Sequence, residues 1–356
     1  MTIYPKLILD ALRNVRYPGN NQDIVSSNMV EDDIRIEGNK VSFSLLLKAN
    51  DPFAKSLVKA AEQAILAYVS EDIDIKGNIS IKSLPAPNPL LNTKSLSNIK
   101  HKIAISSAKG GVGKSTVASN LAVALARKGY KVGLLDADIF GPSIPKMFDI
   151  EDERPLVENV DGKDLIIPIE KLGVKILSIG FFIDKENPVI WRGGMASNAL
   201  KQLINDGKWG DLDFFLIDLP PGTSDIHLTL IQTIDVDGAI IVSTPQQVAL
   251  IDTLKGINMF QNEKVNIPII GLIENMAWFT PAELPNNKYY IFGKDGGKNL
   301  AKEKGISFLG QIPIVQSICE AGDNGSPIVT EEDNMVGTAF GSITENIIQN
   351  IKKTIN

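Results

Sequence analysis

Short runs of apolar residues recur along the second part of the chain, and helical segments separate several of them. The runs are nearly continuous rather than alternating, which is typical of strands buried on both faces of a parallel sheet. They cover residues 101–107, 131–135, 174–179, 214–217, 238–242 and 267–273. Helical spacing is found in residues 116–128 and 248–260. The pattern predicts an α/β fold with a doubly wound, mostly parallel sheet that binds its ligand at the carboxyl ends of the strands.

The first 82 residues carry a different pattern, which predicts a small α/β domain. Helical spacing is expected in residues 4–15 and 52–68, with Asp51 as the cap of the second helix. Residues 41–45, 73–75 and 79–81 alternate as half-buried strands do. Residues 83–100 hold prolines, serines and asparagines without periodicity. We therefore predict a domain of residues 1–82, a linker of 83–100 and a large domain of 101–356.

The most specific motif lies between the first apolar run of the large domain and the helix after it. A glycine-rich loop in this setting turns backbone N–H groups toward a polyphosphate, at the positive end of the helix dipole. Lys114 is expected to reach the β- and γ-phosphates of ATP, and the Ser115 hydroxyl to bind Mg²⁺. A flexible glycine linker would explain neither the preceding strand nor the Lys-Ser-Thr that follows. The expected nucleotide-binding residues are Ala108, where the strict pattern has Gly, then Lys109, Gly110, Gly111, Val112, Gly113, Lys114, Ser115 and Thr116.

Carboxylates follow two of the other predicted strands. Asp136 and Asp138 come after residues 131–135, and Asp218 ends the apolar run before Pro220. A carboxylate at a strand end beside a phosphate loop can hold Mg²⁺ or orient the attacking water. Asp218 is expected to bind Mg²⁺ through water. Asp136 is expected to support the Mg²⁺ site without binding the ion directly. The alternative is that these aspartates only cap turns at strand ends.

The composition of the chain indicates which classes of partner it can bind and in which cellular compartment it is expected. The formal net charge is −6 and the pI is about 5.2, which argues against broad binding to nucleic acid, since that needs a basic face. No apolar run reaches the length of a membrane span, and the first residues lack a signal-peptide pattern. The single cysteine, Cys319, excludes an intrachain disulfide. We expect a cytoplasmic protein with no nucleic-acid or membrane partner.

The loop Lys109 to Thr116, KGGVGKST, resembles the deviant Walker A loop of ATPases that partition chromosomes, place septa or form the nitrogenase iron protein. The resemblance implies that Lys109 reaches the nucleotide of a partner subunit in a homodimer. It also implies that Asp138, the second aspartate of D-x-D, lies in switch I and organises metal and water. In this group Asn275 would recognise the adenine edge and Pro313 would lie beside the base, although Asn275 could also be a turn-forming residue.

Further phrases are similar to the Mrp/ApbC family of ATPases, which carry iron–sulfur clusters to apoproteins. They occur in order at residues 141–145, 191–195, 218–225, 274–276, 289–297 and 320–329. The N-terminal domain resembles the accessory domain of iron–sulfur assembly factors and is expected to dock or regulate. The resemblance implies a Mg²⁺-dependent ATPase that assembles or transfers iron–sulfur clusters, with apoprotein clients or assembly factors as partners.

The cluster site of that family is a C-x-x-C pair, and residues 277–288 of this chain contain no cysteine or histidine. A [4Fe–4S] cluster commonly takes four cysteine thiolates. Cys319 is expected to be a packed apolar residue, with a role as a cluster ligand as the alternative. Glu283 is a conceivable oxygen ligand, although a solvated loop acid is the simpler interpretation. Two other functions stay open: a positional ATPase on a DNA or membrane surface, and an ATP-switched dimeric scaffold without a cluster.

Overall fold

The computed structural model describes most of the chain, and it divides into two compact units, residues 1–91 and 92–356. The described residues are 3–18, 22–27, 29–31, 33–47, 51, 53–83, 96–139, 141–160, 162–182, 193–223, 225–263, 265–281, 283–331 and 335–354.

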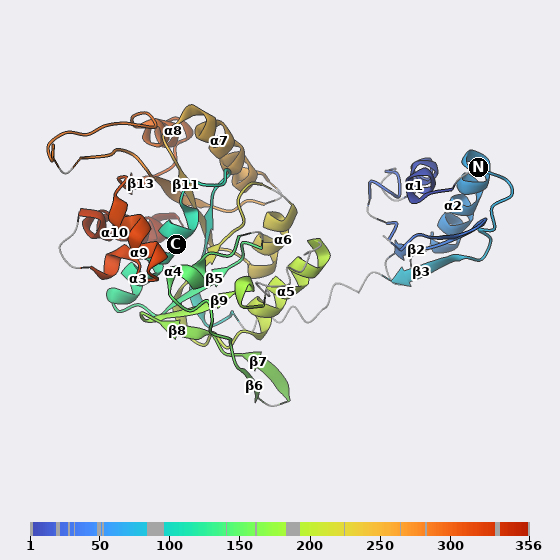
Figure 1. Ribbon diagram of the computed structural model, residues 1–356, viewed down its shortest axis with the longest axis horizontal. Coiled ribbons are helices and arrows are strands. Elements are labelled where there is room, and N and C mark those ends of the chain that lie inside the picture. The colour runs from blue at the N-terminus through green and yellow to red at the C-terminus, as the bar shows by residue number, and fades with distance from the viewer. Residues whose placement is uncertain are drawn as a thin grey trace. The chain divides into compact units, whose positions relative to one another are not determined.

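The first unit packs two helices, α1 (Pro5–Leu12) and α2 (Ala54–Tyr68), against a three-stranded sheet (Figure 1). Strand β2 (Lys40–Leu47) lies in the middle, antiparallel to β1 (Arg35–Glu37) and parallel to β3 (Ile79–Ser83). Helix faces with period 3.6 and strand faces with period 2 meet in one core. Its fully buried members include Ile8, Leu12, Leu45 and Ile65.

Two local expectations in this unit are wrong. Residues 73–75 form no strand, because only Asp74 makes a single bridge, to Lys40. Asp51 does not cap α2, which begins at Ala54; its carboxylate accepts the N–H of Phe53 at 2.8 Å and the hydroxyl of Tyr17 at 2.8 Å. The predicted linker falls mainly outside the described residues.

The second unit is built on an eight-stranded sheet of order β13-β12-β11-β4-β10-β5-β9-β8. Every neighbouring pair is parallel except β8 and β9. The strands are β4 (Ile99–Ser106), β5 (Val132–Asp136), β8 (Ile169–Lys171), β9 (Val174–Ser178), β10 (Leu212–Asp218), β11 (Gly238–Ser243), β12 (Ile269–Glu274) and β13 (Phe308–Gln311). The doubly wound, mostly parallel sheet expected from the apolar runs is confirmed.

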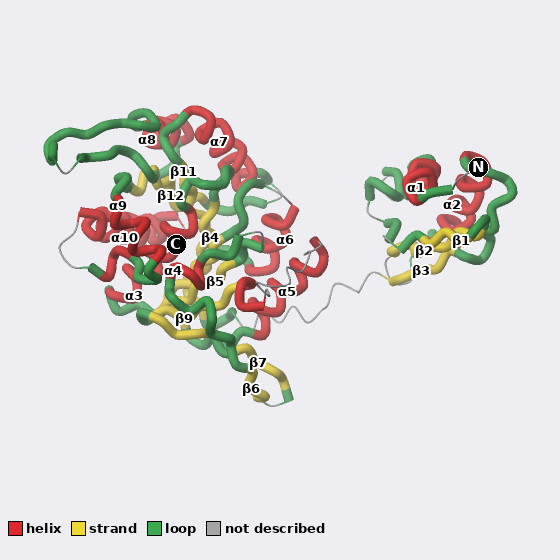
Figure 2. The backbone as a smooth tube through the Cα atoms, in the orientation of Figure 1, coloured by secondary structure: helices red, strands yellow, loops and turns green. Residues whose placement is uncertain are grey.

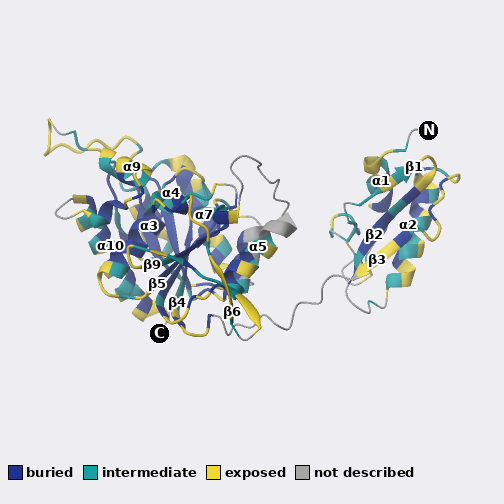
Figure 3. Ribbon diagram, turned by 60° about the horizontal axis from the view of Figure 1, so that its bottom comes forward, coloured by how far each residue is buried: buried dark blue, intermediate teal, exposed yellow. Residues whose placement is uncertain are grey.

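Helices cover both faces of this sheet, so its central strands are buried (Figure 3). One core contains side chains of α3 (Lys114–Arg127) and α10 (Met335–Thr354). The other core contains side chains of α5 (Gly193–Asp206), α6 (Asp225–Ile234), α7 (Gln247–Gln261) and α8 (Gly296–Lys304). The short helices α4 (Ile144–Met147) and α9 (Gln316–Asp323) lie against each other, as their contacts show.

Two features were not predicted from the hydrophobic pattern. Strands β6 (Val157–Val160) and β7 (Lys163–Ile166) form a separate antiparallel hairpin that projects from the unit (Figure 1). The segment between β12 and α8 also extends away from the sheet (Figure 2), with Phe279 and Tyr289 paired near its base by reciprocal backbone hydrogen bonds. We call residues 277–281 and 283–292 the projecting loop.

Replacing Phe340 by Ala should lower the free energy of unfolding by about 3–5 kcal/mol. Phe340 is fully buried on α10, between the helix and the sheet core. Met335 begins the same helix and is 62% exposed, so Met335→Ala is the matched control and should change stability by less than about 0.5 kcal/mol. Urea unfolding of the three proteins checks this. Equal midpoints would show that α10 contributes little to the core.

Candidate nucleotide-binding site

The carboxyl ends of three adjacent strands meet at one edge of the sheet. In the register of β10, Asp218 lies opposite Ile105 of β4 on one side and opposite Asp136 of β5 on the other. The residues that follow these ends are the glycine-rich loop, the segment around Asp138 and the segment around Gly222. Strand register therefore brings the predicted phosphate loop and the predicted carboxylates together.

The loop has the backbone that its glycines allow. Gly111 and Gly113 have φ of +78° and +82°, in the left-handed region that other residues adopt at a cost. Helix α3 begins at Lys114, immediately after Gly113, so its first N–H groups face the loop. This arrangement is suited to an anionic group at the positive end of the helix.

Lys114 and Ser115 both contact the Asp218 carboxylate. The Lys114 ammonium donates to Oδ1 of Asp218 at 2.6 Å, and the Ser115 hydroxyl donates to Oδ2 at 2.6 Å. Asp218 is fully buried and Lys114 is 6% exposed. Burial raises the pKa of the Asp218 carboxyl, and the adjacent Lys114 charge opposes that rise. The pair thus keeps a cation and a carboxylate together at the opening of the loop.

Asp138 completes the set of oxygen donors that Mg²⁺ prefers. Its Oδ2 lies 4.0 Å from the Lys114 ammonium, which also contacts Asp218. A hydroxyl and two carboxylates from Ser115, Asp138 and Asp218 are the hard ligands that magnesium takes together with phosphate oxygens and water. The residues present therefore fit a Mg²⁺ ion held between protein and phosphates.

Asp136 acts on the backbone that follows it. It is fully buried, and it accepts the Ser178 hydroxyl at 2.8 Å and the backbone N–H groups of Asp138 at 3.2 Å and Ile144 at 3.3 Å. Burial, and next the charge of Asp218, raise the pKa of the Asp136 carboxyl to about 7. Asp136 thus caps the turn that carries Asp138. The Ser178 contribution was not predicted, although its position at the end of an apolar run was a signal.

A cavity of about 420 Å³ opens beside the loop, toward β12 and β13. Gly113 and Thr116 line it from the loop, and Asn275 and Pro313 line it from the two strand ends. Its size and position suit the nucleoside part of a nucleotide. The Asn275 side-chain amide also donates to the carbonyl of Val112 at 2.9 Å. The predicted contacts of Asn275 and Pro313 with adenine stay predictions.

Cys319 is not packed in the core as the simpler expectation had it. It is exposed on α9 and lines the same cavity, with its sulfur 3.7 Å from Oδ2 of Asp323. The side chain points out because α9 buries only Ala321 among its residues. Within the described ranges, no three His, Cys, Asp or Glu side chains are grouped to hold a metal ion.

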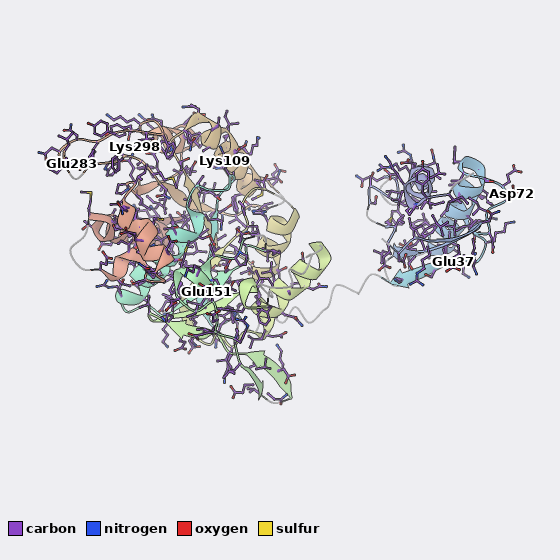
Figure 4. All side chains as sticks on the ribbon, viewed as in Figure 1. Glu37, Asp72, Lys109, Glu151, Glu283 and Lys298 are labelled. Atoms are coloured by element: carbon purple, nitrogen blue, oxygen red, sulfur yellow. The ribbon has the colours of Figure 1, made fainter. Side chains whose placement is uncertain are left out.

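Lys109 lies at the start of the loop (Figure 4). It is half-buried, and it forms no ion pair with the residues that the structure describes. Another contact was not foreseen from sequence. His227, fully buried on α6, has its Nε2 2.6 Å from the carbonyl of Pro220 and so ties α6 to the segment after Asp218.

Comparison with known proteins identifies the family. Residues 98–351 match the family described as NUBPL iron-transfer P-loop NTPase, which is more than half of the chain. The chain belongs to this family. Residues 6–75 of this NTPase also match the family described as iron-sulfur cluster assembly protein.

Its relatives have consistent names. The NTPase is 49% identical to the iron-sulfur cluster carrier protein of Aquifex aeolicus over 75% of this chain and 72% of that one. It is 41% identical to the iron-sulfur cluster carrier protein of Synechocystis over 91% of both chains. The nucleotide-binding protein of Archaeoglobus fulgidus in complex with ADP is 37% identical, with a TM-score of 0.58 over 67% of this chain and 92% of that one. The cell division ATPase MinD of Pyrococcus furiosus shares the fold, at 22% identity and a TM-score of 0.50 over 70% of this chain and 98% of that one.

A nucleotide should protect Cys319 from alkylation. The thiol is exposed on the wall of the cavity beside Asn275 and Pro313, so a maleimide should label the folded NTPase once per chain, and saturating Mg·ADP should slow labelling several-fold. Mass spectrometry of timed samples measures both rates. Urea-unfolded protein is the control and should react equally with and without ADP. Equal rates in the folded protein would place the nucleoside elsewhere.

Proposed function

We propose that this NTPase is a Mg²⁺-dependent ATPase of the iron–sulfur cluster carrier type, which acts as a homodimer and transfers clusters to apoproteins. The proposal rests on one observation. Lys114 and Ser115 both donate hydrogen bonds to Asp218 at the carboxyl ends of β4 and β10, beside a cavity large enough for a nucleoside. The names of relatives that match this chain over three quarters or more of its length support the cargo.

The residues of the loop account for ATP binding and hydrolysis. The N–H groups at the start of α3 and the Lys114 ammonium hold the β- and γ-phosphates, which replace Asp218 as the partner of Lys114. Ser115, Asp138 and Asp218 would hold Mg²⁺, which when bound neutralises phosphate charge. Asp138 orients the water whose oxygen bonds to the γ-phosphorus while the bond between that phosphorus and the bridging oxygen breaks. The products are ADP and inorganic phosphate, and a proton of the water passes to the phosphate or to solvent.

Lys109 is assigned to the nucleotide of the partner subunit. It is at the start of the loop, is half-buried and forms no ion pair with described residues of its own chain. A lysine from a second copy can stabilise the charge that develops on the phosphates, as an in-trans cation does in other phosphoryl transfers. ATP would then favour the dimer, and hydrolysis would relax it.

A positional ATPase is the weaker alternative. Two structural neighbours with cell-division or septum-site names, both MinD proteins, share 22% identity with this chain, which supports the fold alone. The net charge of −6 also disfavours a DNA surface. No helix in the described part of the chain is long and apolar enough to span a membrane. The cytoplasmic location expected from composition stays a prediction.

An iron–sulfur cluster would require thiolate ligands that this chain does not supply. Each copy supplies one cysteine, and the family's cysteine pair is absent from the projecting loop, where Glu283 lies near the outer end (Figure 4). Two copies cannot provide the four thiolates that a [4Fe–4S] cluster commonly takes. We therefore propose that a client, an assembly factor or a small thiol supplies the remaining ligands during transfer, and that the N-terminal unit docks such a partner.

Lys114→Ala should abolish ATP turnover, because it removes the charge that binds the phosphates. Lys109→Ala should also abolish it, yet a mixture of the two variants should recover part of the wild-type rate. In a mixed dimer, the Lys109→Ala subunit keeps its own Lys114 and receives Lys109 from its partner. Phosphate release measures turnover.

Lys128→Ala is the control, since Lys128 follows the other end of α3 and pairs with Glu345 at the surface. It should leave turnover unchanged. Normal turnover by Lys114→Ala would contradict the phosphate-binding role of the loop. A mixture of the two variants without ATP turnover would show that Lys109 acts within its own subunit.

Anaerobic reconstitution with iron, sulfide and an added small thiol should load the wild type with a cluster, and Cys319→Ser should lose it. Iron and sulfide counts per chain and the visible spectrum measure loading. Glu283→Gln is the control and should keep the wild-type iron content, because Glu283 is a solvated loop acid. No iron on the wild type, with or without the thiol, would contradict cluster binding by this chain.

A further inference from the structure

Asn275 contacts the phosphate-binding loop through its side-chain amide. It is the residue directly after β12, and its side-chain amide donates to the Val112 carbonyl at 2.9 Å. Asn275 is 7% exposed and Val112 is 4% exposed, so this hydrogen bond is shielded from water. A buried carbonyl that loses its donor is costly, which makes the loop backbone dependent on this amide.

Gly113 shows how closely the amide fits the loop. A β-carbon built on Gly113 would lie 2.3 Å from Nδ2 of Asn275, a distance that no real contact reaches. Gly113 also has a φ of +82°, which a side chain would strain. The residue before Lys114 is therefore held by two constraints at once, its own backbone conformation and the volume that Asn275 occupies.

The strand end that carries Asn275 is itself anchored. Its backbone N–H donates to the Ser243 carbonyl at 2.8 Å. The preceding residue, Glu274, is fully buried; it accepts the N–H of Gly297 near the start of α8 and the Gln311 side-chain amide at 2.6 Å. The same amide of Gln311 reaches Asp295 at 3.0 Å. Asn275 thus extends from a rigid junction of β11, β12, β13 and α8.

We propose that Asn275 is a positioning residue for the phosphate-binding loop, which sets the loop backbone for polyphosphate through the Val112 carbonyl and independently of any contact with the base. The proposal rests on the proposed nucleotide binding. Its consequence is that Asn275 matters for ligands that have no base at all. A residue that only recognised adenine would be irrelevant to them.

The test compares ATP with inorganic tripolyphosphate, each with Mg²⁺, by calorimetry. Asn275→Ala should weaken both ligands by a similar factor of about 10 or more, because the Val112 carbonyl loses its donor. Asn275→Asp keeps the size of the side chain and replaces the donor with an acceptor, so it should weaken both at least as much. Amide exchange should rise in residues 109–116 of the unliganded variants and stay unchanged in β12 and β13.

Asn346→Ala is the matched control. Asn346 donates from the same kind of amide to the Leu309 carbonyl at 2.9 Å, on α10 and away from the loop, and its loss should leave both affinities unchanged. Variants that lose ATP affinity but keep wild-type affinity for tripolyphosphate would overturn the proposal in favour of a base contact. A wild type that binds neither ligand would instead overturn the proposed nucleotide function.

Discussion

Asp136 and Asp218 are buried carboxylates at the ends of adjacent strands, and Lys114 is the buried lysine beside them. The rest of the site depends on this excess of buried negative charge. Asp136 and Asp218 are opposite each other in the parallel register of β5 and β10, so neither can move away without breaking the sheet. Burial raises the pKa of both carboxyls, the charge of Asp218 raises the pKa of Asp136 further, and the charge of Asp138 raises that of Asp218. Lys114 compensates Asp218, and backbone N–H groups and Ser178 satisfy Asp136. The cation that stabilises the buried carboxylate is therefore the same one that is placed to bind phosphate.

The charged side and the cavity side of the site are built largely by different parts of the sheet. Asp136 and Asp218 end β5 and β10, and Lys114 follows β4. The cavity is lined mainly by the segments that follow β12 and β13 and by α9, and also by α4 and the start of α3. Asn275 joins the two sides because it extends from β12 to the carbonyl of Val112. The projecting loop begins two residues later, so the segment where the family places its cysteines starts from the same anchored strand end.

The family assignment and the cysteine content lead to different conclusions about whether this chain can hold a cluster. Similarity over most of the chain supports an iron–sulfur cargo, while one exposed thiol per copy cannot complete a cluster by itself. Both findings are explained if the protein keeps its NTPase site and shares the cluster ligands with another molecule. The position of Cys319 on the wall of the cavity also places the thiol in the same cavity as Asn275 and Pro313 rather than on the projecting loop.

Sequence alone was sufficient to predict the sheet and to place the glycine-rich loop and the carboxylates at the ends of its strands. Continuous apolar runs are buried on both faces, and a glycine-rich loop between a strand and a helix has few other uses. Sequence could not predict the exposure of Cys319 or the hydrogen bond from Asn275 to the Val112 carbonyl, because exposure and hydrogen-bond partners depend on which elements pack beside them. Cys319 is exposed since α9 turns another residue inward, and Asn275 meets Val112 across 163 positions of the chain. Contacts this distant along the chain arise only when β12 and β4 take their places in one sheet, and only the tertiary structure decides that.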